Sequence, residues 1–301
     1  MIDLTRLPAP AILETVDYEA MQAGFLARFV EQWNRERLRN PALPAWDVGS
    51  LKTDSAVIAS RAWSFLRLLD RERVNDAIRA VLAPLAGGAD LDNVVARVGI
   101  ERLVITPATD RAPAVMESDE RLLARYLLAM TRPAAGSADR YILEAMTAWP
   151  LLHHAVVIGH RVHGRRGDVD LVIAGPGGRD ATDAEMALVR AAAGAASVVP
   201  EATSLYVLRA IRREYEVRGQ IVLPVGPDAE AVRLEAVNRI AAACSTRTLI
   251  NTQVPRDYLA SAAYGLSVTR FDLSEPVTDI TADPYTIPVC KGIALNVEVS
   301  A

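Results

Sequence analysis

The sequence predicts an α+β protein, with an amino-terminal long-helix region followed by one or two small α+β sandwich modules. Between residues 20 and 83, apolar side chains recur every three or four positions, which is the period of a helix. From residue 155 onward they alternate in short runs bounded by glycine and proline, as in strands. A chain of 301 residues, 51% of them hydrophobic, is long enough for two or three domains with separate cores.

Residues 1–88 form the first predicted domain, and they are expected to be mainly helical. A helix over Ala20–Arg37 ends at the break made by Asn40–Pro44. Pro84, Gly87 and Gly88 end the region and give the first domain boundary.

A second helix in this region is the longest element that we expect. Thr53 or Asp54 caps it, and it runs to about Ala83, roughly 45 Å at about 1.5 Å per residue. Its apolar stripe changes face across the charged segment 70–73, and a helix that changes face usually changes neighbours. Two interpretations are open: a helical hairpin within one domain, or a helix contributed to an intermolecular bundle. The apolar positions are Ile58, Ala62, Phe65, Leu66, Leu69, Val74, Ala77, Ile78, Val81 and Leu82.

The central α+β domain, residues 89–226, opens with a short helix that Gly99 ends. A brief or edge strand over Leu103–Ile105 follows, closed by Pro107, and Ser118 caps the next helix. The remaining predicted elements are a helix over Ala138–Ala148, a hairpin of strands Ala155–Val162 and Asp168–Ala174, a helix capped by Thr182, and strands Leu205–Ile211 and Tyr215–Val225. This β-β-α-β order indicates a sheet with helices packed on one face.

The carboxy-terminal module, residues 227–301, is predicted to have two helices followed by two strands. The first helix begins at Pro227-Asp228, and the second spans Val254–Ala263. The strands cover Leu266–Leu273 and Ile293–Val299, and a loop holding Pro276, Pro284 and Pro288 separates them. In the strand at Tyr215–Val225, one face is expected to hold Tyr215, Val217, Ile221, Leu223 and Val225.

All four histidines fall within eleven residues, at His153, His154, His160 and His163. On one strand, His154 and His160 share a face while His153 and His163 share the other, so they cannot all reach one ion. A metal site needs three or four convergent ligands, and no H-E-x-x-H or Cys/His framework is present. We therefore predict no metal and no cofactor. The alternative function is a metal-dependent hydrolase that uses the His153–His163 hairpin.

Other motifs give no sign of an enzyme. G-P-G-G at 175–178 lacks the Lys-Ser/Thr of a phosphate loop, so it is interpreted as a tight turn. There is no G-x-S-x-G motif. Cys244 and Cys290 lie far apart in the sequence with no metal or redox spacing, and the sequence does not decide whether they form a disulfide. The net charge of −4 and the interrupted arginine clusters do not favour nucleic acid. No signal peptide or membrane span is expected, which favours a soluble cytoplasmic chain.

Several ordered segments resemble the phage baseplate assembly protein J family. They are R-V-N-D-A-I-R-A-V at 73–81, G-G-A-D-L-D at 87–92, R-L-V-I-T-P-A at 102–108 and A-V-M-E-S-D at 114–119, preceded by I-D-L-T-R-L-P-A-P at 2–10. Ordered matches over more than a hundred residues are more specific than any single short motif. In the carboxy-terminal half, the resemblance extends only to the pattern of elements.

The resemblance implies a structural role at the tip of a contractile phage tail or of a related tailocin, with no enzymatic activity. A protein of this kind builds wedges around the hub, typically as two copies with a smaller partner whose helices join a core bundle. Its carboxy-terminal part contacts neighbouring wedges in a six-fold ring, which transmits the trigger for sheath contraction. Other implied partners are the sheath-adaptor protein and hub or spike proteins. Assembly would take place in the host bacterial cytoplasm and the product would lie in the virion baseplate.

The long helix is the candidate for the core bundle. We expect its outward apolar positions to form the interface with the partner chains. The predicted interface residues are Ile58, Ala62, Phe65, Leu66, Leu69, Val74, Ile78 and Val81.

Overall fold

The computed structural model describes residues 8, 10–48, 51–131, 133–226, 228–265 and 267–300. It is a mixed α and β protein, with helices first and sheets afterwards, as the sequence predicts. The chain divides into two compact units, Met1–Glu101 and Arg102–Ala301. The three-domain division at residues 88 and 226 stays a prediction. The resemblance at residues 2–10 lies outside the described residues except at Pro8 and Pro10.

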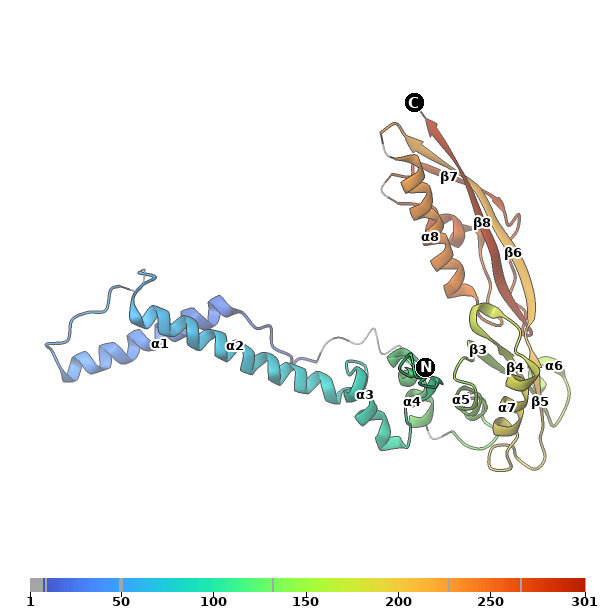
Figure 1. Ribbon diagram of the computed structural model, residues 1–301, viewed down its shortest axis with the longest axis horizontal. Coiled ribbons are helices and arrows are strands. Elements are labelled where there is room, and N and C mark those ends of the chain that lie inside the picture. The colour runs from blue at the N-terminus through green and yellow to red at the C-terminus, as the bar shows by residue number, and fades with distance from the viewer. Residues whose placement is uncertain are drawn as a thin grey trace. The chain divides into compact units, whose positions relative to one another are not determined.

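The amino-terminal unit contains the two predicted long helices. Helix α1 covers Tyr18–Arg39 and is capped by Asp17, while α2 covers Ser55–Val81 and is capped by Asp54. The side chain of each aspartate accepts hydrogen bonds from the first-turn amides, so both starts follow from the cap rule. The helices lie side by side as a hairpin (Figure 1).

The same unit ends in a shorter helix, as the sequence predicts. Helix α3, Gly88–Val95, continues into a 3₁₀ turn, η2, over Ala96–Val98. Gly99 follows with a φ of 75°, a left-handed conformation that glycine adopts more easily than residues with a Cβ. Leu91, Val94 and Val95 are buried.

The second unit opens with a small hairpin and two helices. Strands β1, Val104–Thr106, and β2, Val115–Met116, pair antiparallel, so the strand before Pro107 is brief as expected. Ser118 caps helix α4, Asp119–Met130, and Ser137 caps helix α5, Ala138–Ala148. Both predicted starts are confirmed, and the side chains of the two serines accept from the amides of Arg121 and Arg140.

The central sheet has three strands in the order β3-β4-β5. Strand β3, His154–Ile158, runs antiparallel to β4, Asp168–Ala174, and β4 runs parallel to β5, Ser204–Arg209. Between β4 and β5 lie the 3₁₀ turn η3, Pro176–Gly178, and helix α7, Asp183–Ala193, which Thr182 begins with a capping box. Helices α5 and α7 cover one face of the sheet (Figure 1), as predicted.

The carboxy-terminal sheet also has three strands, in the order β7-β6-β8. Strand β6, Ile211–Pro224, pairs antiparallel with β7, Arg270–Glu275, and parallel with β8, Thr286–Ser300. Helices α8, Ala229–Arg247, and α9, Arg256–Ala263, pack on one face and close an apolar core. A smaller core joins this sheet to the central one through Val172 and Ala174 of β4 and Ile287 and Val289 of β8.

Several predicted boundaries are wrong. Strand β7 begins at Arg270, four residues after the predicted start at Leu266, which itself lies outside the described residues. Ile211 begins β6 instead of ending β5. Strand β3 stops at Ile158, and His160–His163 forms the short helix α6 instead of continuing the strand. Strand β8 begins at Thr286, with Pro288 inside it, because a proline is tolerated in an edge strand whose outer amide needs no partner. Val254 forms an isolated bridge with Ile280 instead of starting α9. Val225 lies beyond β6 and is 74% exposed.

Candidate functional site

The outer surface of α2 carries the residues that the sequence predicts as an interface. Seven of the eight are exposed and Ile78 is half-buried. Leu66 and Val74 are 62% and 57% exposed, although both are large and apolar. About half or more of each of these large side chains other than Ile78 stays exposed, so this apolar surface is available to a partner chain.

The side of α2 that faces α1 is polar, in contrast to its outer surface. Of its buried residues, one is Val57 and the others are Ser60, Ser64 and Asn75. Gln22 of α1 donates to Ser60 Oγ at 3.2 Å. Asn75 accepts from the backbone amide of Glu14 at 3.1 Å and donates to its carbonyl at 2.9 Å. The hairpin is therefore held by hydrogen bonds and small side chains together with the ring contact between Phe25 and Trp63, while most of the large apolar groups of α2 stay exposed.

The exposed apolar residues of α2 form two separate stripes. At about 100° per residue, Ile58, Phe65 and Leu69 lie within roughly 40° of one another. Val74 and Val81 form a second stripe roughly 150° around the helix from the first. The buried row of Val57, Ser60, Ser64 and Asn75 lies roughly 120° from the first stripe on the other side. The predicted change of face across residues 70–73 thus leaves α2 with one covered side and two open apolar sides.

One exposed aromatic residue was missing from the predicted interface. Trp63 is 44% exposed and its ring lies 5.2 Å from that of Phe25, centroid to centroid. By helical angle it belongs to the stripe of Val74 and Val81. The sequence signal was its spacing of eleven and eighteen residues from those two valines, which repeats nearly whole turns of the helix.

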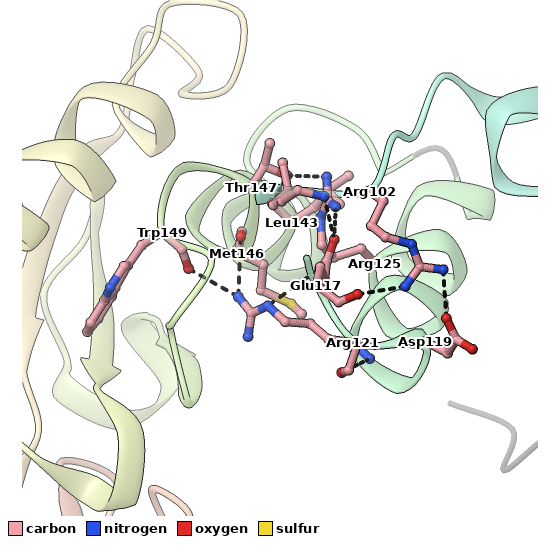
Figure 2. A network of polar contacts seen from close by, with 11 residues as sticks. Arg102, Glu117, Asp119, Arg121, Arg125, Leu143, Met146, Thr147 and Trp149 are labelled. Atoms are coloured by element: carbon pink, nitrogen blue, oxygen red, sulfur yellow. Dashed lines mark hydrogen bonds and ion pairs between the residues drawn. The ribbon is translucent and has the colours of Figure 1, made fainter. Parts of the chain in front are cut away.

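A second cluster that the sequence did not indicate joins β2, α4 and α5 by buried charges (Figure 2). Glu117, whose side chain is fully buried, forms a 2.7 Å ion pair with Arg125 and accepts from the amide of Leu103 at 3.1 Å. Arg121 donates to the carbonyls of Leu152 and Trp149 at 2.5 and 3.1 Å. Burial lowers the pKa of Arg121, and the nearby Glu117 carboxylate opposes this effect.

The Glu117 cluster acts as a structural clamp. Arg102 extends it by donating to the Glu117 carbonyl at 2.6 Å and pairing with Asp119 at the same distance. Arg121 and Arg125 are four residues apart on one side of α4, and Glu117 lies four residues before Arg121, just ahead of the cap Ser118; this spacing was the available sequence signal. The partners of these side chains are groups of the protein itself, and a buried ion pair of this kind orients elements more than it stabilises them.

The four histidines do not converge. His153 Nε2 lies 2.7 Å from the carbonyl of Thr248, and His154 Nδ1 accepts from the amide of Ile250 at 3.1 Å. His163 Nδ1 accepts from the amide of Arg165, and His160 is exposed on α6. Burial lowers the pKa of His154 to about 4, and the neighbouring His153 adds to the shift. In the part of the chain that is described, no group of three or more His, Cys, Asp or Glu could hold a metal ion.

The remaining motifs also have structural partners. Gly178 of the G-P-G-G turn has a φ of 77°, and a Cβ there would lie 2.8 Å from Val289, so glycine is required by packing. Arg209 donates to the carbonyl of Ala181, and Arg165 pairs with the buried Asp170 at 2.6 Å. These arginines support the fold and form no continuous basic surface for nucleic acid. None of the described helices is long and apolar enough to cross a bilayer.

A helix with open apolar sides is typical of a protein that assembles with other chains. Comparison with known proteins specifies the class. Residues 52–109, which include all of α2, match the family model described as the Baseplate J-like N-terminal domain. The chain is also 28% identical over 306 residues to Baseplate protein J of Escherichia phage P2, covering 96% of this chain and 95% of that protein.

The two matches confirm the resemblance that the ordered segments indicated. Residues 52–109 are similar to the Baseplate J-like N-terminal domain, and nearly the whole chain is similar to a phage baseplate protein. The family model ends at residue 109, so for the carboxy-terminal sheet and its helices the similarity is carried by the full-length relative.

Proposed function

We propose that this chain is a structural wedge component of the baseplate of a contractile phage tail or tailocin. Similarity to a phage baseplate protein over nearly the whole chain supports a structural role in a phage baseplate. The observation that carries the finer proposal is the outer surface of α2, whose large apolar residues stay largely exposed in the described part of the chain. In the wedge, α2 joins a core bundle with a second copy of the chain and a smaller helical partner.

Each copy of α2 has two open stripes, so it can contact two neighbours at once. The stripe of Ile58, Phe65 and Leu69 contacts one neighbour, and that of Val74 and Val81 contacts the other. A three-helix bundle needs this arrangement, because every helix in it faces two others. The charged segment 70–73 lies where the contact passes from one neighbour to the next.

The carboxy-terminal sheet supplies the contacts between neighbouring wedges. Six such contacts close a ring around the hub, since a repeated head-to-tail interface closes when its rotation allows. The ring transmits the trigger for contraction of the sheath, with the sheath-adaptor protein and the hub or spike proteins as its other partners. The protein acts mechanically and not as an enzyme.

The test of this proposal is affinity purification of a tagged copy from cells in which the phage or tailocin is induced. Co-purifying proteins are identified by mass spectrometry, and native mass spectrometry gives the stoichiometry. A complex with two copies of this chain and one smaller tail protein is expected. A monomer of 32.5 kDa without tail partners would contradict it.

The ring contact needs a test by surface substitution. Removing the last 80 residues would delete α8, β7 and β8 and expose the buried face of β6, so the remainder would not stay folded. Val277 and Val225, which are 73% and 74% exposed, are better targets. Replacing both with glutamate is expected to leave wedges that form but do not close into rings in electron micrographs. Normal rings from this variant would exclude these two valines from the contact.

A further inference from the structure

The two cysteines, which lie 46 residues apart in the chain, meet in the carboxy-terminal part of the second unit. Cys244 is on α8 and Cys290 is on β8, and both line an open cavity of about 610 Å³ between these elements. Both cysteines pack in the core beneath α8, and the Cys290 thiol donates to the carbonyl of Gly292 at 3.5 Å. Both are free thiols.

A third group converges on the pair. Tyr215 of β6 lies against Cys244, and its hydroxyl is buried without a well-aligned hydrogen-bond partner. The approach of Cys290 and Tyr215 lowers the pKa of Cys244, while burial and the nearby Cys244 sulfur raise the pKa of Cys290. Cys244 is therefore the thiol with more thiolate character, and the thiolate is the nucleophilic form.

We propose that Cys244 and Cys290 are a redox-active pair that a hydroperoxide converts into a disulfide joining α8 to β8. The cavity admits a small oxidant to the sulfurs, and the pair supplies both an attacking and a resolving thiol. This proposal is independent of the wedge assignment, because it rests on residues of the second unit and α2 belongs to the first.

The chemistry balances with hydrogen peroxide as the oxidant. The Cys244 thiolate attacks one peroxide oxygen, an S–O bond forms, the O–O bond breaks, and the released hydroxide takes a proton to become water. The Cys290 sulfur then attacks the Cys244 sulfenic acid, the S–S bond forms, and hydroxide leaves with the Cys290 proton as a second water. Two thiols lose two electrons, and one peroxide is reduced to two waters.

The structural consequence follows from where the bond forms. Cys244 lies in the last turns of α8 and Cys290 lies one residue before the bulge at Lys291 in β8. A disulfide there closes a loop that contains α9, β7 and most of the proline-bearing segment that follows β7. Such a link restricts the unfolded chain and resists separation of the helix from the sheet.

The test treats the full-length reduced protein with hydrogen peroxide and then maps its peptides by mass spectrometry without reduction. We expect a linked peptide pair containing Cys244 and Cys290, a loss of about 2 Da per chain, and full reversal by dithiothreitol. The thermal midpoint should rise by several degrees on oxidation and return on reduction.

Two matched variants separate a redox pair from a merely structural one. In Cys290→Ser the sulfenic acid of Cys244 is expected to accumulate and react with dimedone, whereas Cys244→Ser is expected to give no such adduct. If a variant does not fold, the peptide map of the unaltered protein still shows whether the disulfide between Cys244 and Cys290 forms. Unreacted thiols, chain-to-chain disulfides, or a sulfinic acid on Cys244 without a linked peptide would each overturn the proposal.

Discussion

Helix α2 and strand β6 each carry a row of large apolar residues, but β6 buries its row and α2 leaves its row open. Val217, Ile221 and Leu223 of β6 are fully buried beneath α8 and α9. Phe65 and Leu66 of α2 are 55% and 62% exposed, and serine and asparagine occupy its covered side. The difference teaches that the carboxy-terminal sheet completes its own core, whereas the amino-terminal hairpin leaves large apolar side chains exposed, and this exposure is the basis for proposing α2 as the contact with other chains.

The largest effect on the free energy of unfolding is expected at Glu117, because its carboxylate is buried against the Arg125 guanidinium. Glu117→Gln leaves the buried Arg125 without its carboxylate, so the free energy of unfolding should fall by about 3–5 kcal/mol. Urea denaturation with hydrogen exchange over α4 measures it. The control is Glu14→Gln, which removes the exposed pair with Arg71 and should cost less than about 1 kcal/mol. Equal losses in the free energy of unfolding for the two variants would contradict the role of the Glu117 cluster as a structural clamp.

A matched pair of leucines tests the comparison directly. Leu223→Ala should destabilise the isolated protein by about 2–5 kcal/mol, because it opens a cavity in the core beneath α8. Leu66→Ala should change the stability of the isolated protein by less than about 0.5 kcal/mol, because Leu66 is already exposed. Chemical denaturation of both variants gives the answer. A cost at Leu66 near that at Leu223 would mean that the chain itself covers α2.

The pH dependence of the second unit should come partly from His154. Its pKa is about 4 in the folded protein and about 6.5 when unfolded, so the folded state favours the neutral ring. Above pH 6.5 both states are neutral and stability is complete. Between pH 6.5 and 4 the unfolded chain binds the proton first, so stability falls by roughly 1–3 kcal/mol.

The variant that isolates this effect is His154→Asn. An asparagine oxygen replaces Nδ1 as the acceptor for the Ile250 amide but does not titrate in this range. Thermal midpoints measured from pH 7.5 to 4.5 should fall less steeply for this variant than for the unaltered protein. His160→Asn, at an exposed histidine, should keep the original slope. Identical slopes of thermal midpoint against pH for all three proteins would show that His154 does not contribute to the pH dependence.

The smallest effect is expected at the polar seam between α1 and α2. Ser64 Oγ is buried without a hydrogen-bond partner, so Ser64→Ala should be neutral or stabilising by up to about 1 kcal/mol. Asn75→Ala removes two hydrogen bonds to the backbone of Glu14 and should speed hydrogen exchange around that residue. A destabilisation by Ser64→Ala of more than about 1 kcal/mol would show that this hydroxyl has a partner in solution.

Most elements could be predicted from local pattern, because their signals are local. Asp54, Ser118 and Thr182 cap helices as expected, and Gly99 adopts the left-handed conformation that its position requires. The outward stripe of α2 was visible as helical spacing. Which of its sides α1 would cover was not, because that choice depends on Ser60, Ser64 and Asn75, residues that hydrophobic periodicity ignores.

Contacts between distant segments could not be predicted. The meeting of Cys244 with Cys290 requires α8 to pack on β8, and the Glu117 cluster requires α4 to approach the end of α5. The histidine strand was predicted too long because Gly159 and Gly164, which bound the short helix α6, carry no signal of apolar period. Tertiary packing decided each of these positions.

The central claim is that the outer side of α2 joins other chains, and one binding experiment tests it most directly. Phe65→Glu with Leu69→Glu is compared with Leu188→Glu with Val162→Glu, which adds the same charge at apolar residues of similar exposure in the second unit. Circular dichroism verifies that both variants fold. Native mass spectrometry of tagged protein from induced cells should find the α2 variant as a single chain and the control in the full complex. A complete complex with the α2 variant would contradict the claim.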